Sequence, residues 1–227
     1  MRPVIFSYSN LNIDPEFLTT QKRCFDAFGM SIVQIQDFLL HGEGLDRWVN
    51  HFADHRDVIA IFDVDAVCTD PAWLKETMSR CIQAPLVVGG LHNANHTMFS
   101  VEHLTEDYAS PACMVFSVST WKAARRWSKL DDLFRCRWHS DIQTAWDCAQ
   151  TFSHIVREMG GVVETLMPVS VRQPMWRSKA GPMTGYGTDY GPCYHEWGAG
   201  MGVPERIAAF KAYVEEKVSP RTLCVRP

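Results

Sequence analysis

Two aspartates stand two residues apart at the end of an apolar run, Ile61-Phe62-Asp63-Val64-Asp65. The run predicts a buried strand, and open α/β sheets bind their ligands at the carboxyl ends of the strands. If the extended backbone continues, residues at i and i+2 point the same way, so the two carboxylates can share one hard cation. That cation could hold a diphosphate and neutralise charge that develops on it. Alternatively, Asp63 and Asp65 only form a turn at the end of the strand.

Other polar residues follow two further apolar runs. Tyr8 and Asn10 lie just past the first run, where they are candidates to stack on a nucleobase and hydrogen-bond to it. Tyr8 could equally be a core aromatic residue with a satisfied hydroxyl group. His92 and Asn95 belong to a polar stretch beyond another run, and an ordinary surface loop would have the same composition.

The elements that must position these residues alternate between strands and helices. Aspartate–proline pairs at Asp14-Pro15 and Asp70-Pro71 are typical of helix starts, with a cap followed by proline in the first turn. This alternation predicts a single α/β domain with a mostly parallel central sheet flanked by helices. The predicted strands cover residues 3–6, 31–35, 58–62, 86–88, 113–118 and 162–167, and the predicted helices cover residues 14–29, 44–55, 70–82, 119–128, 140–159 and 204–218.

The pattern changes after Gly90. Residues 91–110 are polar, and Ser140 is the expected cap of a long helix that ends at Met159. Residues 172–202 contain many glycines with aromatic residues between them, which predicts a long irregular loop. The aromatic residues favour a functional loop over a disordered one.

Composition excludes several classes of protein. The chain has 227 residues, 46% of them hydrophobic, and a net charge of −4, which argues against a nucleic-acid coat protein. Its apolar runs are far shorter than the roughly 18 residues of a membrane span, and the N-terminus turns polar too early for a secretory signal. The eight cysteines form no CxxC pair, so neither a zinc knuckle nor a disulfide framework is indicated. We therefore expect a cytoplasmic protein without a membrane span.

In the order of its motifs the chain resembles the GT-A-type glycosyltransferases, which use nucleotide-sugar donors. The resemblance covers most of the chain: an N-terminal strand segment, a DxD motif, a strand that would flank the sugar pocket, a helix-opening acid and a late histidine. These are Val4-Ile5-Phe6-Ser7-Tyr8-Ser9-Asn10, Asp63-Val64-Asp65, Ser110-Pro111-Ala112-Cys113-Met114-Val115-Phe116, Trp138-His139-Ser140-Asp141 and Cys193-Tyr194-His195-Glu196-Trp197.

The resemblance implies a GT-A-like, Rossmann-like domain over residues 1–227. Residues 1–90 would form the nucleotide-binding half, and residues 91–227 the acceptor half with a C-terminal active-site loop. It also implies a donor, expected to be a UDP-sugar. The segment Gly89-Gly90-Leu91-His92-Asn93-Ala94-Asn95-His96 is similar to small phage-encoded members of the group. For such a member the location would be the host cytoplasm, and a hydroxymethylated base in DNA would be a candidate acceptor.

The resemblance also implies roles for individual residues. Asp65 would be the principal metal ligand, Asp63 would bind the metal or the ribose, and His195 would complete the metal site, with Glu196 as a competitor. An imidazole beside carboxylates suits Mn²⁺ better than Mg²⁺, which prefers oxygen ligands. Asp141 would remove the proton of the acceptor hydroxyl, unless it only stabilises the start of a helix. His92 and Asn95 would approach the donor sugar and the acceptor.

Other functions fit the same residues. Asp63-Val64-Asp65-Ala66-Val67 also resembles the DxDx[TV] strand of haloacid-dehalogenase-type phosphatases, with Asp63 as nucleophile and Asp65 as acid/base. A non-catalytic module that binds a nucleotide or a sugar is the third hypothesis.

Asp147, further along the predicted 140–159 helix, is expected on an exposed face.

Overall fold

The structure is a computed structural model of the chain. It describes residues 1–227 except 11–12, 93–105, 136, 140–143, 199–201 and 220–227, and it leaves out the side chains of residues 10, 137–139 and 144–146. The strands are β1 (Pro3–Asn10), β2 (Val33–Asp37), β3 (Val58–Phe62), β4 (Ala66–Cys68), β5 (Leu86–His92), β6 (Tyr108–Ser117), β7 (Arg137–His139), β8 (Thr144–Trp146), β9 (Val162–Leu166), β10 (Ser170–Arg177), β11 (Met183–Asp189) and β12 (Cys193–His195). The helices are α1 (Pro15–Ala27), α2 (His41–Ala53), α3 (Pro71–Gln83), α4 (Val118–Ser128), α5 (Gln150–Glu158) and α6 (Pro204–Val218).

A six-stranded sheet in the order β2-β1-β3-β6-β5-β9 forms the centre of the molecule. The pairs β1–β2, β1–β3 and β5–β9 are parallel, and β6 runs antiparallel to both of its neighbours. Five strands therefore point the same way and one points back. The predicted fold class, α/β with a mostly parallel central sheet, is confirmed.

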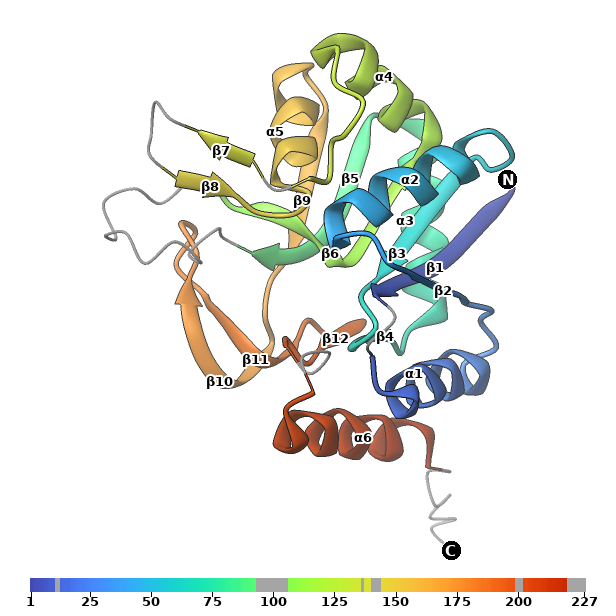
Figure 1. The fold of residues 1–227 in the computed structure, drawn as a ribbon, viewed down its shortest axis with the longest axis vertical. Helices are drawn as coiled ribbons and strands as arrows, with labels where there is room; N and C mark the ends of the chain where they lie inside the picture. Colours follow the sequence, from blue (N-terminus) through green and yellow to red (C-terminus); the bar gives the residue numbers. More distant parts are fainter. Residues whose placement is uncertain (11–12, 93–105, 136, 140–143, 199–201, 220–227) are drawn as a thin grey trace, which may run out of the picture.

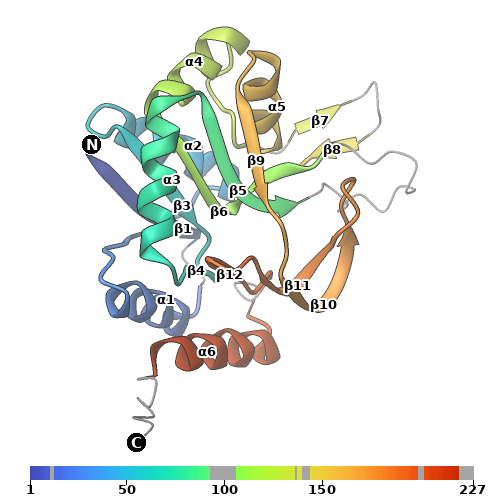
Figure 2. The ribbon, with the colours of Figure 1, turned by 180° about the vertical axis from the view of Figure 1, so that it is seen from behind.

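Helices cover both faces of this sheet (Figures 1 and 2). On one face α2, α4 and α5 bury an aromatic cluster of Phe116, Trp121, Phe134 and Phe152. On the other face α1, α3 and α6 cover a second core. Both aspartate–proline pairs start helices as predicted: the carboxylates of Asp14 and Asp70 accept hydrogen bonds from backbone N–H groups of the first helical turn.

A buried carboxylate fixes the segment that follows α4. Asp46 of α2 accepts hydrogen bonds from the backbone N–H groups of Leu133 and Phe134, at 2.8 and 3.0 Å. Burial raises the pKa of Asp46 to about 7 from its ordinary value of 3.8. Between these two values the folded chain therefore binds more protons at this residue than the unfolded chain does, and stability falls as the pH rises.

We expect the Asp46→Asn variant to lose this dependence. Between pH 4 and pH 8 the free energy of unfolding of the unaltered protein should fall, relative to the variant, by roughly 2–4 kcal/mol. Urea unfolding across this range measures the difference. Asp26→Asn, at an exposed carboxylate on α1, is the control and should show no comparable change. A constant difference between the unaltered protein and Asp46→Asn would contradict the assignment.

The predicted loop over residues 172–202 is wrong, because most of this segment is a second sheet. β10, β11, β12 and β4 form it, in that order, with antiparallel pairing. The glycines of this segment predict an irregular backbone, but Gly185 and Gly187 lie within β11. At Gly185 a Cβ atom would stand 2.1 Å from the Gln173 carbonyl oxygen, so close strand packing accounts for that glycine.

The predicted helix over residues 140–159 is also wrong in its first half. Residues 137–146 contain the antiparallel strands β7 and β8, and α5 begins only at Gln150. Ser140 lies outside the described residues. Ala149, with a φ of 68°, precedes α5 in the left-handed region. Asp147 therefore stands before the helix, not on its exposed face.

None of the helices within the described ranges is long and apolar enough to cross a bilayer.

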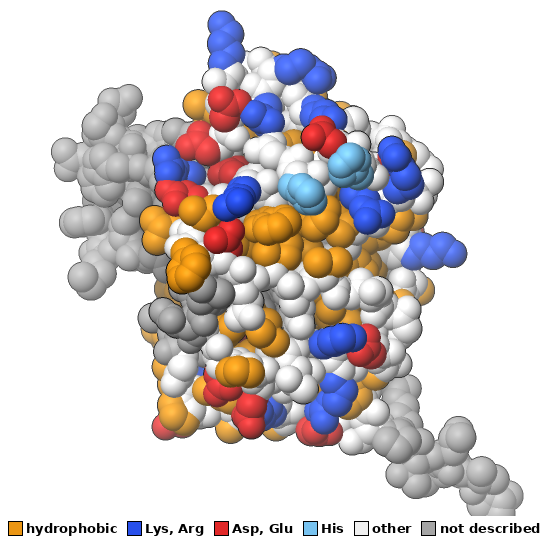
Figure 3. Space-filling model, turned by 45° about the vertical axis from the view of Figure 1, so that its right-hand side comes forward, with side chains coloured by type: hydrophobic (Ala, Val, Ile, Leu, Met, Phe, Trp, Pro, Cys, Tyr) orange, Lys and Arg blue, Asp and Glu red, His pale blue; other side chains and the backbone are white. Residues whose placement is uncertain are grey.

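On the side of the molecule that carries β1 and β2, a band of hydrophobic side chains lies between zones of charged groups (Figure 3). Val33 of the edge strand β2 is 45% exposed.

Candidate metal centre

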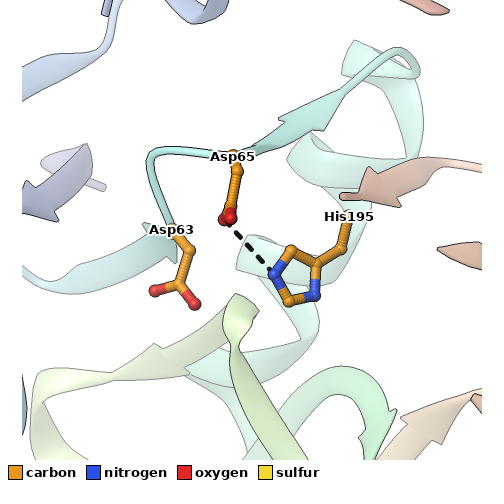
Figure 4. A group of neighbouring side chains, drawn as sticks. All are labelled: Asp63, Asp65 and His195. Atoms are coloured by element: carbon orange, nitrogen blue, oxygen red, sulfur yellow. Dashed lines mark ion pairs between the residues drawn. The ribbon is translucent and has the colours of Figure 1, made fainter. Parts of the chain in front are cut away.

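A tight turn between β3 and β4 brings the two aspartates together. The backbone N–H of Ala66 donates to the Asp63 carbonyl at 2.9 Å, which closes a β-turn over residues 63–66. The extended backbone assumed for the Asp63-Val64-Asp65 motif is therefore absent. The turn reverses the chain, and both carboxylates still lie on the same side of it (Figure 4).

His195 completes the group from a distant part of the sequence. β12 pairs with β4 so that His195 lies opposite Ala66, directly beside the turn. The His195 Nε2 atom is 3.3 Å from Asp65 Oδ1, and both side chains are more than nine-tenths buried. One ligand atom from each of Asp63, Asp65 and His195 lies within 4.8 Å of the others. The structure thus brings together the three residues predicted to hold a metal.

The geometry of this group fits a divalent cation. Two ligands bound about 2.2 Å from one ion lie about 3.1 Å apart when they are adjacent and about 4.4 Å apart when they are opposite. A group whose ligand atoms lie within 4.8 Å of one another therefore needs small side-chain shifts to bind one ion. The Asp63 Oδ1 atom is buried, and His41 Nε2 lies 3.0 Å from it. A buried carboxylate needs a cation or hydrogen-bond donors beside it, and a bound cation would add to the contact with His41.

Charges inside the group oppose the effect of burial. Burial by itself would lower the pKa of His195, but the carboxylates of Asp65 and Asp63 outweigh it and raise that pKa. Burial would raise the pKa of Asp63, but the imidazoles of His41 and His195 lower it. Asp63 is therefore held in its ionised form, which is the form that binds metal.

His41 is a residue of the site that the sequence analysis missed. It occupies the first position of α2, and its side chain is 41% exposed. The sequence shows no fixed spacing between His41 and the aspartates, because the approach depends on how α2 packs against β1 and β3. The only signal in the sequence was that His41 lies between the predicted strand at 31–35 and the predicted helix at 44–55.

The buried side-chain amide of Gln21 holds the turn between β3 and β4. Gln21 of α1 is fully buried, and its Nε2 donates to the carbonyls of Asp63 and Ala66, at 2.7 and 2.9 Å. Gln34 of β2 in turn donates to Gln21 Oε1 at 3.1 Å. The backbone of the turn that carries both aspartates is therefore fixed by a side chain on another element.

The Gln21→Leu variant should therefore weaken metal binding without removing a ligand. We expect the affinity for Mn²⁺ to fall 10- to 100-fold, as for other changes to residues that orient metal ligands. The free energy of unfolding should also fall by about 1–3 kcal/mol, because the Asp63 and Ala66 carbonyls each lose one donor and Gln34 loses the Gln21 oxygen that it donates to. Calorimetric titration with Mn²⁺ measures the first effect. Gln36→Leu, at an exposed position of β2, is the control, and equal Mn²⁺ affinity in both variants would contradict the role of Gln21.

The metal group lies in a cavity of about 300 Å³ at the carboxyl ends of β1, β3 and β5. Its walls come from both sheets and from the segment before α5. The residues that line it are Tyr8, Ser9, Ile13, His41, Asp63, Val64, Asp65, His92, Tyr108, Ser110, Pro111, Asp147, Cys148, His195, Trp197 and Gly198. Among these described residues are three aspartates and three histidines, and no lysine or arginine.

The structure describes only some of the side chains that were predicted to bind the nucleotide or the donor. Tyr8 lines the cavity, but it is 2% exposed and its hydroxyl donates to the Leu39 carbonyl at 2.8 Å. At Gly44, a Cβ atom would stand 1.9 Å from the Tyr8 ring, so α2 packs directly on that ring. The backbone of Asn10 ends β1, but its side chain, like all of Asn95 and Asp141, lies outside the described residues.

A second His–Asp pair lines the same cavity. His92, at the end of β5, is 4% exposed, and its Nε2 is 3.7 Å from Asp147 Oδ2. The Tyr108 hydroxyl donates to the same Asp147 oxygen at 2.8 Å. The prediction that Asp147 lies on an exposed helix face is wrong, because Asp147 precedes α5 and lines the cavity.

Glu196 points away from the metal group. Glu196 follows β12, and its carboxylate contacts the hydroxyl of Tyr194, which lies on the other face of the strand from His195. It is fully buried and bonded to Arg172 and to the Tyr194 hydroxyl. Its backbone N–H donates to the Asp65 carbonyl at 2.9 Å. Glu196 therefore joins β12 to the turn and does not compete with His195 as a ligand.

Comparisons with known proteins add little. No protein-family model matches the chain, and no curated protein matches it. One similar solved structure is the crystal structure of A197 from STIV, with a TM-score of 0.36 and 12% identity over 52% of this chain. The match spans 65% of A197, less than two thirds of its length. A likeness this weak carries no argument about function.

Proposed function

We propose that this chain is a divalent-metal-dependent glycosyltransferase, which moves a sugar from a nucleotide-sugar donor to an acceptor hydroxyl. The observation that carries the proposal is the convergence of Asp63, Asp65 and His195 at the edge of one cavity. That cavity lies outside the carboxyl ends of parallel strands, where α/β sheets bind nucleotides.

The charge of the cavity supports a metal-bound diphosphate. Its described lining contains three carboxylates and no lysine or arginine, so a diphosphate would be repelled without a cation. The ligand set of two carboxylates and one imidazole favours Mn²⁺ over Mg²⁺. When bound, the ion would supply positive charge beside the leaving nucleoside diphosphate.

The chain's own residues would orient the reaction around that ion. Asp63 and Asp65 are fixed by the Gln21 amide and the β4–β12 pairing. Tyr8 and Ser9, at the end of β1, line the side of the cavity on which a nucleotide would lie. We propose a UDP-sugar as the donor.

Asp147 is our candidate for the group that removes the proton of the acceptor hydroxyl. Among the carboxylates in the described lining, Asp147 is the one outside the metal group. Tyr108 and Cys148 hold its two oxygens through hydrogen bonds of 2.8 and 2.7 Å. A base fixed in this way can be directed at a hydroxyl in the cavity.

Incubation with UDP-, GDP- and dTDP-sugars in the presence of Mn²⁺ tests the proposal. We expect nucleoside diphosphate to be released from one of these donors, and EDTA to abolish the release. Hydrolysis of p-nitrophenyl phosphate, with no reaction of any nucleotide sugar, would instead support the phosphatase that uses Asp63 as nucleophile. Metal-dependent binding of a donor without turnover would instead support the non-catalytic binding module.

A further inference from the structure

Three aromatic side chains form a wall beside the metal cavity. Trp176 of β10, Tyr186 of β11 and Trp197, which follows β12, make up this aromatic wall. The ring centroids of Trp176 and Trp197 are 4.5 Å apart, and those of Trp176 and Tyr186 are 5.7 Å apart. All three side chains are half-buried. The three rings therefore pack edge to face into one aromatic cluster on the second sheet.

The aromatic wall is held in place by neighbouring groups. The Arg206 guanidinium lies 3.5 Å from the centroid of the Tyr186 ring, and it also donates to the Trp197 carbonyl at 3.3 Å. Cation–π contacts of this kind fix the ring they cover. Rings fixed before a ligand arrives lose little conformational freedom on binding.

The aromatic wall continues into the cavity. Trp197 lines the cavity itself, together with His92 and Asp147. The His92 ring contacts Trp176 at 5.6 Å and lies 6.3 Å from Trp197. A ligand on the wall would therefore lie beside the cavity that holds both the proposed base and the metal group.

We propose that the aromatic wall binds a pyranose ring of a saccharide acceptor, an inference that rests on the proposed glycosyltransferase function. The C–H groups on one face of a pyranose carry partial positive charge and pack on the electron-rich face of an aromatic ring. The hydroxyl groups of a sugar are matched by the His and Asp side chains of the cavity. A polynucleotide is disfavoured, because its phosphates would meet three carboxylates.

Binding of saccharides to the metal-free protein tests the inference independently of the donor reaction. The probes are the methyl glycosides of glucose, galactose, mannose and N-acetylglucosamine, with a ten-residue oligothymidylate for comparison. Saturation-transfer NMR reports binding in each case. We expect at least one glycoside to bind, and Trp197→Ala and Trp176→Ala to weaken that binding about tenfold.

Two variants separate binding from folding. Trp197→Phe keeps an aromatic face and should retain most of the affinity. Trp127→Ala, at a 54%-exposed tryptophan of α4, should bind like the unaltered protein. No saccharide binding up to about 20 mM, or equal binding in Trp197→Ala, would overturn the inference. So would oligothymidylate binding that Trp197→Ala weakens. Because no ion or donor is present, failure of the metal proposal would leave these results unchanged.

Discussion

The Asp65→Asn variant is expected to lose Mn²⁺ binding and, with it, sugar transfer. Asp65 is 5% exposed and lies 3.3 Å from His195, so in the proposed metal centre it would supply a buried anionic ligand. Changes to residues that only support a ligand already cost 10- to 100-fold in affinity, so loss of the ligand should cost more than about 100-fold. Electron paramagnetic resonance of added Mn²⁺ measures binding, and released nucleoside diphosphate measures activity.

Asparagine keeps the shape of the side chain, so the fold should survive this change. The backbone bond from Glu196 N–H to the Asp65 carbonyl does not depend on the side chain. Asp26→Asn, at an exposed carboxylate paired with Lys22, is the matched control and should bind Mn²⁺ normally. If Asp65→Asn bound Mn²⁺ as tightly as this control, the metal centre would lie elsewhere.

The Asp147→Asn variant should separate proton transfer from metal binding. We expect kcat for transfer to fall by about 10²–10⁴, the usual contribution of a positioned general base. Mn²⁺ affinity should stay within about twofold, because Asp147 is not among the three grouped ligands. Single-turnover assays with a saturating donor measure the rate, and the titration used for Asp65→Asn measures the affinity.

Tyr108→Phe provides the graded comparison for Asp147→Asn. It removes the 2.8 Å hydrogen bond to Asp147 but leaves the carboxylate, so kcat should fall only about tenfold. A transfer rate in Asp147→Asn equal to that of the unaltered protein would remove Asp147 from the mechanism. Asp141, outside the described residues, would then be the next carboxylate to test.

Local sequence patterns were sufficient for most elements in the first half of the fold, although β4 was not among the predicted strands. Aspartate–proline pairs placed α1 and α3 correctly, because their capping depends only on adjacent residues. The all-apolar strand β3 and the aspartates behind it were likewise visible as a short motif. What the motif did not show was the turn between Asp63 and Ala66, since an aspartate pair is compatible with both extended and turned backbone.

The remaining parts of the site depend on contacts between distant segments. β12 is only three residues long and owes its position to pairing with β4, which no local pattern encodes. The same holds for His41, whose approach to Asp63 follows from helix packing. The glycines in residues 172–202 predict an irregular loop, but Gly185 permits close strand packing in β11.

The β4–β12 pairing has a consequence for biosynthesis. During translation, the turn with both aspartates leaves the ribosome long before the strand that carries His195. The three proposed ligands therefore come together only after residue 195 has been made and the late strand has docked. An ion that binds all three residues would stabilise that docked state over the open one. Cells low in manganese should then accumulate chains whose C-terminal sheet is sensitive to proteases.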